Sequence, residues 1–154
     1  MSKLNKDDLP EWHRYFAATA NNRAWELSTQ ERTAAQDQEM LNAAHASAYH
    51  WSSVGTELHQ MRATMLLAEV HALLGFGRSA YSFAEDMRAF FTSQETPDWE
   101  LAFTHTIHAH ASHVNGAMEE YARSFAEAER AIESIADDED RAIVLQTFNL
   151  VPKP

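Results

Sequence analysis

Two stretches of this chain carry the same pattern of small, apolar and glycine residues, one 41 residues after the other. When Gly75 is placed over Gly116, the small and apolar residues around each glycine superpose. The tetrapeptide SFAE also occurs twice at nearly this offset, at 82–85 and at 124–127. Internal repetition at a fixed period is typical of folds built from an array of similar units. The repeat therefore limits the architecture more than any other feature.

The residue types predict that these units are helical. The chain has only four glycines and four prolines, alanine is abundant, and runs that alternate β-branched with polar residues are missing. Apolar residues recur instead at intervals of three and four, which is the spacing of one face of an α-helix. The expected helices cover about residues 10–27, 29–54, 57–74, 78–91, 97–114, 121–135 and 138–149.

Residues that cap helices mark several of these boundaries. Ser28 followed by Glu31 predicts a capping box, Thr56 predicts the start of the next helix, and Thr96 precedes a proline suited to a first turn. The acidic run at 137–140 suits the N-terminus of a last helix and lacks the glycine and spaced oxygens of a calcium loop. The stretch 65–75, MLLAEVHALLG, is apolar on nearly every side, which predicts a central helix.

Residues 58–135 resemble two degenerate tetratricopeptide repeats. In that family the first helix of each hairpin has a small residue midway and a glycine near its end, and the second carries small or aromatic residues. The resemblance implies an all-α fold of about seven helices in an antiparallel, right-handed array of helical hairpins. We expect residues 1–154 to form one domain, with N-terminal helices in 1–56 and a capping helix at 138–149.

The whole chain is also similar to a group of small bacterial cytosolic proteins with no assigned function. The shared stretches are NNRAWEL at 21–27, AAHASAYHW at 43–51 and VHALLG at 70–75. This similarity implies a cytoplasmic protein. The polar start, MSKLNKDDLPEW, agrees with it because it contains no apolar signal segment.

Charge and missing motifs narrow the function. Twelve basic against 23 acidic residues give a formal charge of −11, which opposes binding to nucleic acid and to anionic membrane surfaces. With no cysteine, the chain forms neither disulfides nor iron–sulfur clusters. The sequence contains no HExxH, GxSxG, GxGxxG or phosphate-binding glycine loop, and no Glu-x-x-His pair of a di-iron bundle. It therefore favours a non-enzymatic protein without a cofactor.

The tetratricopeptide resemblance implies a groove lined by the first helix of each hairpin. Such a groove would accept a peptide segment or a small polar ligand. The positions expected to face it are Arg62, Met65, Glu69, Thr106, His110 and His113. The repeat alignment places Glu69 beside His110. The alternative is that Arg62 and Glu69 simply form a solvated face of a mostly buried helix.

Four of the nine histidines lie within HTIHAHASH at 105–113. At roughly 100° per residue they spread over more than half of a helix, so they cannot all face one ion. His105 and His108, one turn apart, could supply two ligands to zinc, nickel, copper or iron, with His71 or His45 as a third. The alternative function is therefore a metal-dependent enzyme or metal sensor. Packing of these histidines against the following helix is the competing interpretation.

Two repeats alone bury too little apolar surface to form a stable core. The flanking helices, or a second subunit, must therefore cover the exposed faces, and the sequence predicts a homodimer through any apolar face that is left. The four tryptophans are interpreted as core and helix-junction residues rather than a ligand cage. They are Trp12, Trp25, Trp51 and Trp99.

Overall fold

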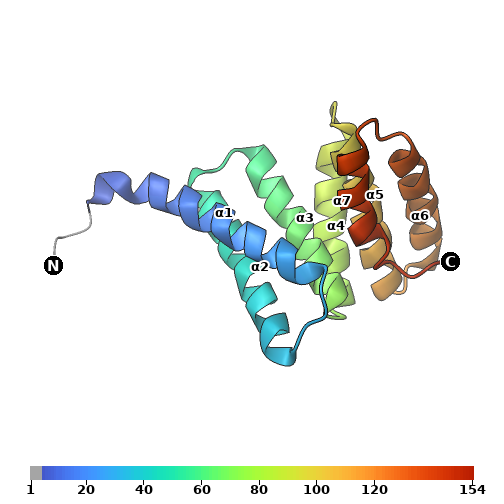
Figure 1. The fold of residues 1–154 in the computed structure, drawn as a ribbon, viewed down its shortest axis with the longest axis horizontal. Helices are drawn as coiled ribbons and strands as arrows, with labels where there is room; N and C mark the ends of the chain where they lie inside the picture. The colour runs from blue at the N-terminus through green and yellow to red at the C-terminus, as the bar shows by residue number, and fades with distance from the viewer. Residues whose placement is uncertain (1–4) are drawn as a thin grey trace.

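The computed structural model describes residues 5–154, which form seven α-helices and no strand (Figure 1). This confirms the all-α prediction and the expected number of helices. None of the helices in residues 5–154 is both long and apolar enough to cross a membrane. After a short 3-10 turn, η1 (Lys6–Asp8), the helices are α1 (Leu9–Ser28), α2 (Ala34–Val54), α3 (Glu57–Leu73), α4 (Gly77–Thr92), α5 (Asp98–Val114), α6 (Met118–Glu133) and α7 (Asp138–Phe148).

Two of the predicted caps are wrong and two are confirmed. Ser28 is the last residue of α1, and its hydroxyl donates to the carbonyl of Trp25 instead of capping α2. The capping box of α2 is formed five residues later by Thr33 and Gln36. Thr96 does not cap α5, because its hydroxyl donates to the carbonyl of Phe91.

The caps at Thr56 and at the acidic run are present. Thr56 accepts a hydrogen bond from the backbone of His59, and Asp137 accepts one from the backbone of Asp140. Each side chain satisfies a backbone N–H that the first helical turn leaves without an intrahelical partner. The acidic run therefore starts α7, as its charge predicts.

The two superposed glycines end α3 and α5 in the same way. Gly75 and Gly116 have φ values of 82° and 77°, in the left-handed region that a residue with a Cβ rarely adopts. After each, the next backbone N–H donates to the carbonyl five residues back, from Phe76 to His71 and from Ala117 to Ser112, both at 2.9 Å. This is the Schellman arrangement of a helix C-terminus. The sequence repeat is thus a repeat of backbone geometry.

The helices pack as three antiparallel hairpins, α1/α2, α3/α4 and α5/α6, and α7 lies against α5 (Figure 1). Contacts also join α1 to α3, α3 to α5 and α5 to α7. These four helices therefore form one layer, and within residues 5–154 α2, α4 and α6 pack on that layer and not on one another. The start of α1 projects from the body as an arm (Figure 1).

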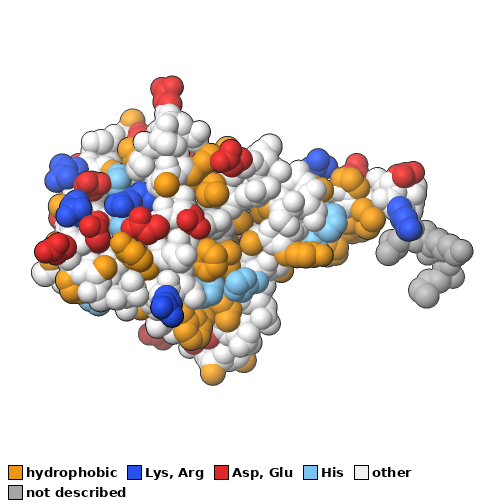
Figure 2. Space-filling model, turned by 180° about the vertical axis from the view of Figure 1, so that it is seen from behind, with side chains coloured by type: hydrophobic (Ala, Val, Ile, Leu, Met, Phe, Trp, Pro, Cys, Tyr) orange, Lys and Arg blue, Asp and Glu red, His pale blue; other side chains and the backbone are white. Residues whose placement is uncertain are grey.

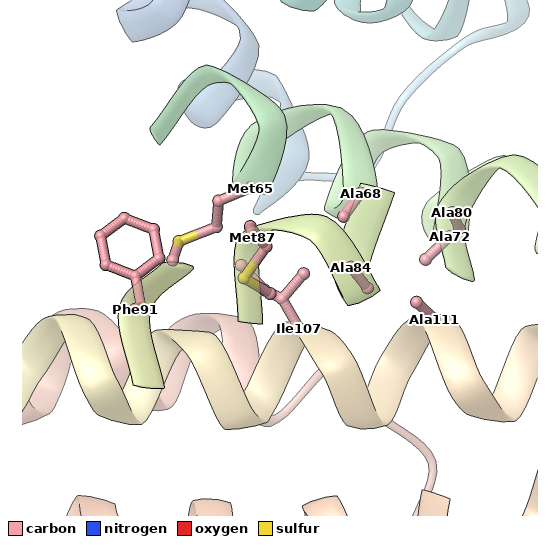
Figure 3. Packing of buried hydrophobic residues seen from close by; sticks show 9 residues of the cluster. All are labelled: Met65, Ala68, Ala72, Ala80, Ala84, Met87, Phe91, Ile107 and Ala111. Carbon is pink, nitrogen blue, oxygen red and sulfur yellow. The ribbon is translucent and has the colours of Figure 1, made fainter. Parts of the chain in front are cut away.

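The largest core cluster lies where α3, α4 and α5 meet (Figure 3). Five alanines let the three helices approach closely, and Met65, Met87, Phe91 and Ile107 fill the other end of the cluster. Every residue of α3 from Met65 to Ala72 is buried. This confirms that α3 is the central helix.

Candidate functional site

A groove crosses the layer formed by α1, α3, α5 and α7. Its volume is about 460 Å³, and its walls are mainly apolar. No single hairpin forms it, because each of these four helices contributes one side or part of the floor. Its main lining side chains are Trp25 from α1, Arg62 and Met65 from α3, Trp99 and Phe103 from α5, and Ile143 from α7.

A fixed positive charge lies on the floor of the groove. Arg62 donates to both carboxylate oxygens of Glu100, with Nε–Oε2 at 2.6 Å and Nη2–Oε1 at 3.1 Å. The Glu100 side chain is 3% exposed and that of Arg62 is 41% exposed. The hydrogen bonds and charge of Glu100 raise the pKa of Arg62. The guanidinium therefore stays charged, and its orientation is set by a two-pronged ion pair with the buried Glu100.

Three aromatic rings lie in the same groove as this charge. The ring centroids of Trp25 and Phe103 are 5.7 Å apart, and those of Trp99 and Phe103 are 6.4 Å apart at nearly a right angle. The Arg62 Cζ atom lies 5.8 Å from the Trp99 ring centroid, within the range of a cation–π contact. Trp25 and Trp99 therefore pack on the core, as expected for them, and each also lines the groove.

Only two of the six side chains predicted to line a groove do so, Arg62 and Met65. Thr106 is fully buried, and His113 is half-buried with its ring 4.8 Å from that of Tyr121 on α6. Glu69 and His110 are brought together, as the repeat alignment predicts, but in the buried interface between α3 and α5.

Glu69 and His110 form a buried ion pair. His110 Nδ1 lies 2.9 Å from Oε1 and 3.0 Å from Oε2 of Glu69. Burial lowers the pKa of His110, but the charge and hydrogen bond of Glu69 have the larger combined effect and raise it above its ordinary value. Because neither side chain reaches the groove, the pair holds two helices together rather than a ligand.

The four histidines predicted as metal ligands do not converge on one point. His108 Nε2 is 2.9 Å from Glu85 Oε1, and His105 Nδ1 is 3.1 Å from Glu127 Oε2. His71 Nδ1 contacts the carbonyl of Leu67, and its ring lies 5.3 Å from that of His45. In residues 5–154 no group of three or more His, Asp or Glu side chains is placed to hold a metal ion. His105 and His108 face α4 and α6, which agrees with the packing interpretation.

A hydrogen-bonded series through His108 was not predicted from the sequence. Besides Glu85 at Nε2, His108 has the Ser124 hydroxyl 2.7 Å from Nδ1. A neutral ring that donates from Nε2 to the carboxylate can accept from the serine hydroxyl at Nδ1. The order carboxylate, histidine, serine is that of a hydrolase triad. Ser124 and His108 are both buried, however, so a substrate has no access to this serine and the chain is structural.

Burial of the histidines predicts that the protein loses stability as the pH falls from about 7.5 to about 5.5. Burial outweighs the contact with Glu85 and lowers the pKa of His108, and burial also lowers those of His45, His50 and His105. The unfolded chain therefore binds more protons in this range. His105 and His108 are the two that are largely buried, and each contributes up to about 1.4 kcal/mol per pH unit to the slope of the unfolding free energy. The exposed His45 and the half-buried His50 contribute less, because solvent screens their charges.

Urea unfolding at several pH values measures this slope. His108→Gln should flatten it, because one neutral buried histidine is removed. His110→Gln combined with Glu69→Gln should steepen it, since the raised pKa of His110 stabilises the fold at low pH, this contribution is lost as the pH rises, and the double variant leaves no buried carboxylate unpaired. A slope of the opposite sign in the wild type would contradict the assignment of mostly neutral histidines.

No protein-family model, curated protein or solved structure matches this chain. The tetratricopeptide resemblance therefore stays a prediction, and the function must be inferred from the residues of the groove. Several of its residues lie on helices that the repeat resemblance does not cover. Among them are Trp25 on α1 and both Ile143 and Thr147 on α7.

Proposed function

We propose that this chain is a non-enzymatic binding domain that holds a peptide segment or a small polar ligand in the groove between α1, α3, α5 and α7. The observation that carries the proposal is the combination of an aromatic wall with a guanidinium held in place by a buried carboxylate. Pockets that bind small molecules or peptide side chains have this composition, mostly apolar with a few fixed polar groups.

The arrangement indicates which ligand groups would be recognised. An apolar or aromatic side chain would stack between Trp25, Trp99 and Phe103, which contribute contact area at a low entropic cost. In residues 5–154, Nη1 of Arg62 has no hydrogen-bond partner, while Nε and Nη2 are held by Glu100. Nη1 therefore offers two N–H donors to a ligand carbonyl or carboxylate, beside the second N–H of Nη2.

Placing a charge in the apolar wall should abolish this binding. Ile143 on α7 lines the groove and is 54% exposed, so Ile143→Glu should fold normally while adding a carboxylate where the ligand packs. We expect peptides selected from a random displayed library against the wild type to bind Ile143→Glu at least about tenfold more weakly. Fluorescence titration measures this, since Trp25 and Trp99 report directly on the groove.

Met118→Glu is the matched control. Met118 is 52% exposed and lies on α6, which contributes no lining residue to the groove. It should bind the selected peptides as the wild type does. Equal binding by Ile143→Glu and the wild type would place the binding site elsewhere on the protein.

A further inference from the structure

The arm at the N-terminal end of the fold carries an exposed apolar surface separate from the groove. We call this surface the arm patch. Its five side chains are 45–67% exposed. Figure 2 shows hydrophobic side chains gathered along this arm next to histidines. The members of the arm patch are Leu9, Trp12, Tyr15 and Phe16 on α1 and Tyr49 on α2.

The arm patch is continuous. The ring centroid of Trp12 lies 6.1 Å from that of Tyr15 and 5.9 Å from that of Phe16. The half-buried ring of His50 connects the two helices, with its centroid 5.6 Å from Phe16 and 5.5 Å from Tyr49. A row of touching rings thus crosses from α1 to α2, in contrast to the single exposed apolar residues of an ordinary surface.

Within residues 5–154, the fold leaves this surface uncovered. No side chain of α1 from Leu9 to Phe16 is buried, and the first buried residue of the helix is Ala17. The later half of α1 packs on both α2 and α3, whereas the arm projects beyond the body of the molecule (Figure 1). The aromatic residues of the arm therefore contribute little to the core of their own chain.

We propose that the arm patch is the interface through which two copies of this chain form a two-fold homodimer. Five such side chains at these exposures present roughly 500 Å² per copy, because a large apolar side chain has about 150–250 Å² to bury. Two copies would together bury about 1,000 Å², which is the lower limit for a specific interface. The contact would be small, and self-association accordingly moderate.

Low charge at this place permits the approach of a second copy. The chain as a whole carries −11, so two copies repel each other. Residues 5–16 hold two basic and three acidic side chains, and residues 47–54, which provide Tyr49, hold no Asp, Glu, Lys or Arg. The arm is thus nearly neutral, and two copies that meet there bring little like charge together.

The shape of the arm patch also suits a self-complementary contact. Asn5, Leu9, Trp12 and Phe16 surround a hollow of about 300 Å³, and the ring of Tyr15 projects beside it. In a two-fold interface the same surface meets itself, so each copy offers one projection and one hollow. Tyr15 of one copy would enter the hollow of the other, and the reverse contact would follow by symmetry.

Sedimentation equilibrium of the full chain tests this proposal. At about 100 µM, well above the roughly micromolar Kd of a small specific interface, the wild type should have twice the mass of the 17.5 kDa chain. Trp12→Glu should weaken self-association at least about thirtyfold, as expected for a central tryptophan of an interface. Met118→Glu changes an equally exposed residue on α6 and should leave the dimer intact.

Two results would overturn the proposal. One is a wild type that stays monomeric at about 100 µM, where a specific contact of this size should be occupied. The other is a dimer dissociation constant that is unchanged in Trp12→Glu and in Tyr49→Glu, which would place the interface elsewhere. Tyr49→Glu acts from α2, so it separates loss of the dimer from any local unfolding of the arm, and circular dichroism confirms that each variant is folded.

Discussion

Glu69→Ala is expected to lower the free energy of unfolding by about 3 kcal/mol. The Glu69 side chain is fully buried, and both of its oxygens lie within 3.0 Å of His110 Nδ1. Removing one partner of a buried ion pair leaves the other without compensation, which typically costs about 3–5 kcal/mol. The cost should fall at the lower end, because the imidazole can release its proton and become neutral. In a domain of this length that is roughly 6–12 °C of melting temperature.

Urea unfolding followed by circular dichroism measures this loss, and two variants serve as controls. Glu26→Ala removes a carboxylate that is 63% exposed and should change stability little. Replacing both partners, as Glu69→Leu with His110→Phe, should recover most of the loss, because no buried charge is left unpaired. If Glu69→Ala and Glu26→Ala unfold at the same urea concentration, the buried pair does not stabilise the fold.

Phe91→Ala is expected to cost about 3–5 kcal/mol, a large share of the roughly 5–15 kcal/mol that stabilises a domain. Phe91 is fully buried and fills one end of the core between α3, α4 and α5, beside Met65 (Figure 3). Removing the Phe91 ring deletes its apolar contacts and leaves a cavity that three tightly packed helices cannot close. Met65 also lines the groove, so the loss should extend to peptide binding.

The neighbouring Phe90 provides the matched control. It is only half-buried, and its ring centroid lies 5.0 Å from that of Phe91. Phe90→Ala deletes the same atoms at a partly solvated position, so its cost should be clearly smaller in the same urea experiment. Equal costs for the two variants would show that the cluster collapses around the missing ring.

The sequence predicts the helices and their repetition well, because both depend on local chemistry. Gly75 and Gly116 end their helices in the same left-handed conformation, and Thr56 starts α3 as expected. The cap at Ser28 is wrong because the same kind of motif, Thr33 with Gln36, occurs in the following loop and starts α2 instead. Local signals identify a boundary but cannot choose between two adjacent candidates.

The side of the helix on which a residue lies was harder to predict. The contact between Glu69 and His110 follows from the repeat, since equivalent positions on α3 and α5 lie next to each other. The burial of this pair does not follow from the sequence. Helix α3 is apolar on nearly every side, so the spacing of its apolar residues marks no single inner face. The groove itself needs α1 and α7 to lie across α3 and α5. No local pattern specifies such long-range packing.

In residues 5–154 the backbone of each helix packs only on helices near it in the sequence, and α1 reaches α5 through side chains, where the ring of Trp25 meets that of Phe103. A chain with such local contacts folds quickly, because little loop-closure entropy must be overcome before the first hairpins form. It also opens from its ends, since a terminal hairpin is held by a single neighbour. Detachment of the α1/α2 hairpin would remove the Trp25 wall while α3 and α5 keep Arg62 and Glu100 in place. The groove can thus admit a bulky segment by partial unfolding at one end, at a free-energy cost below that of global unfolding.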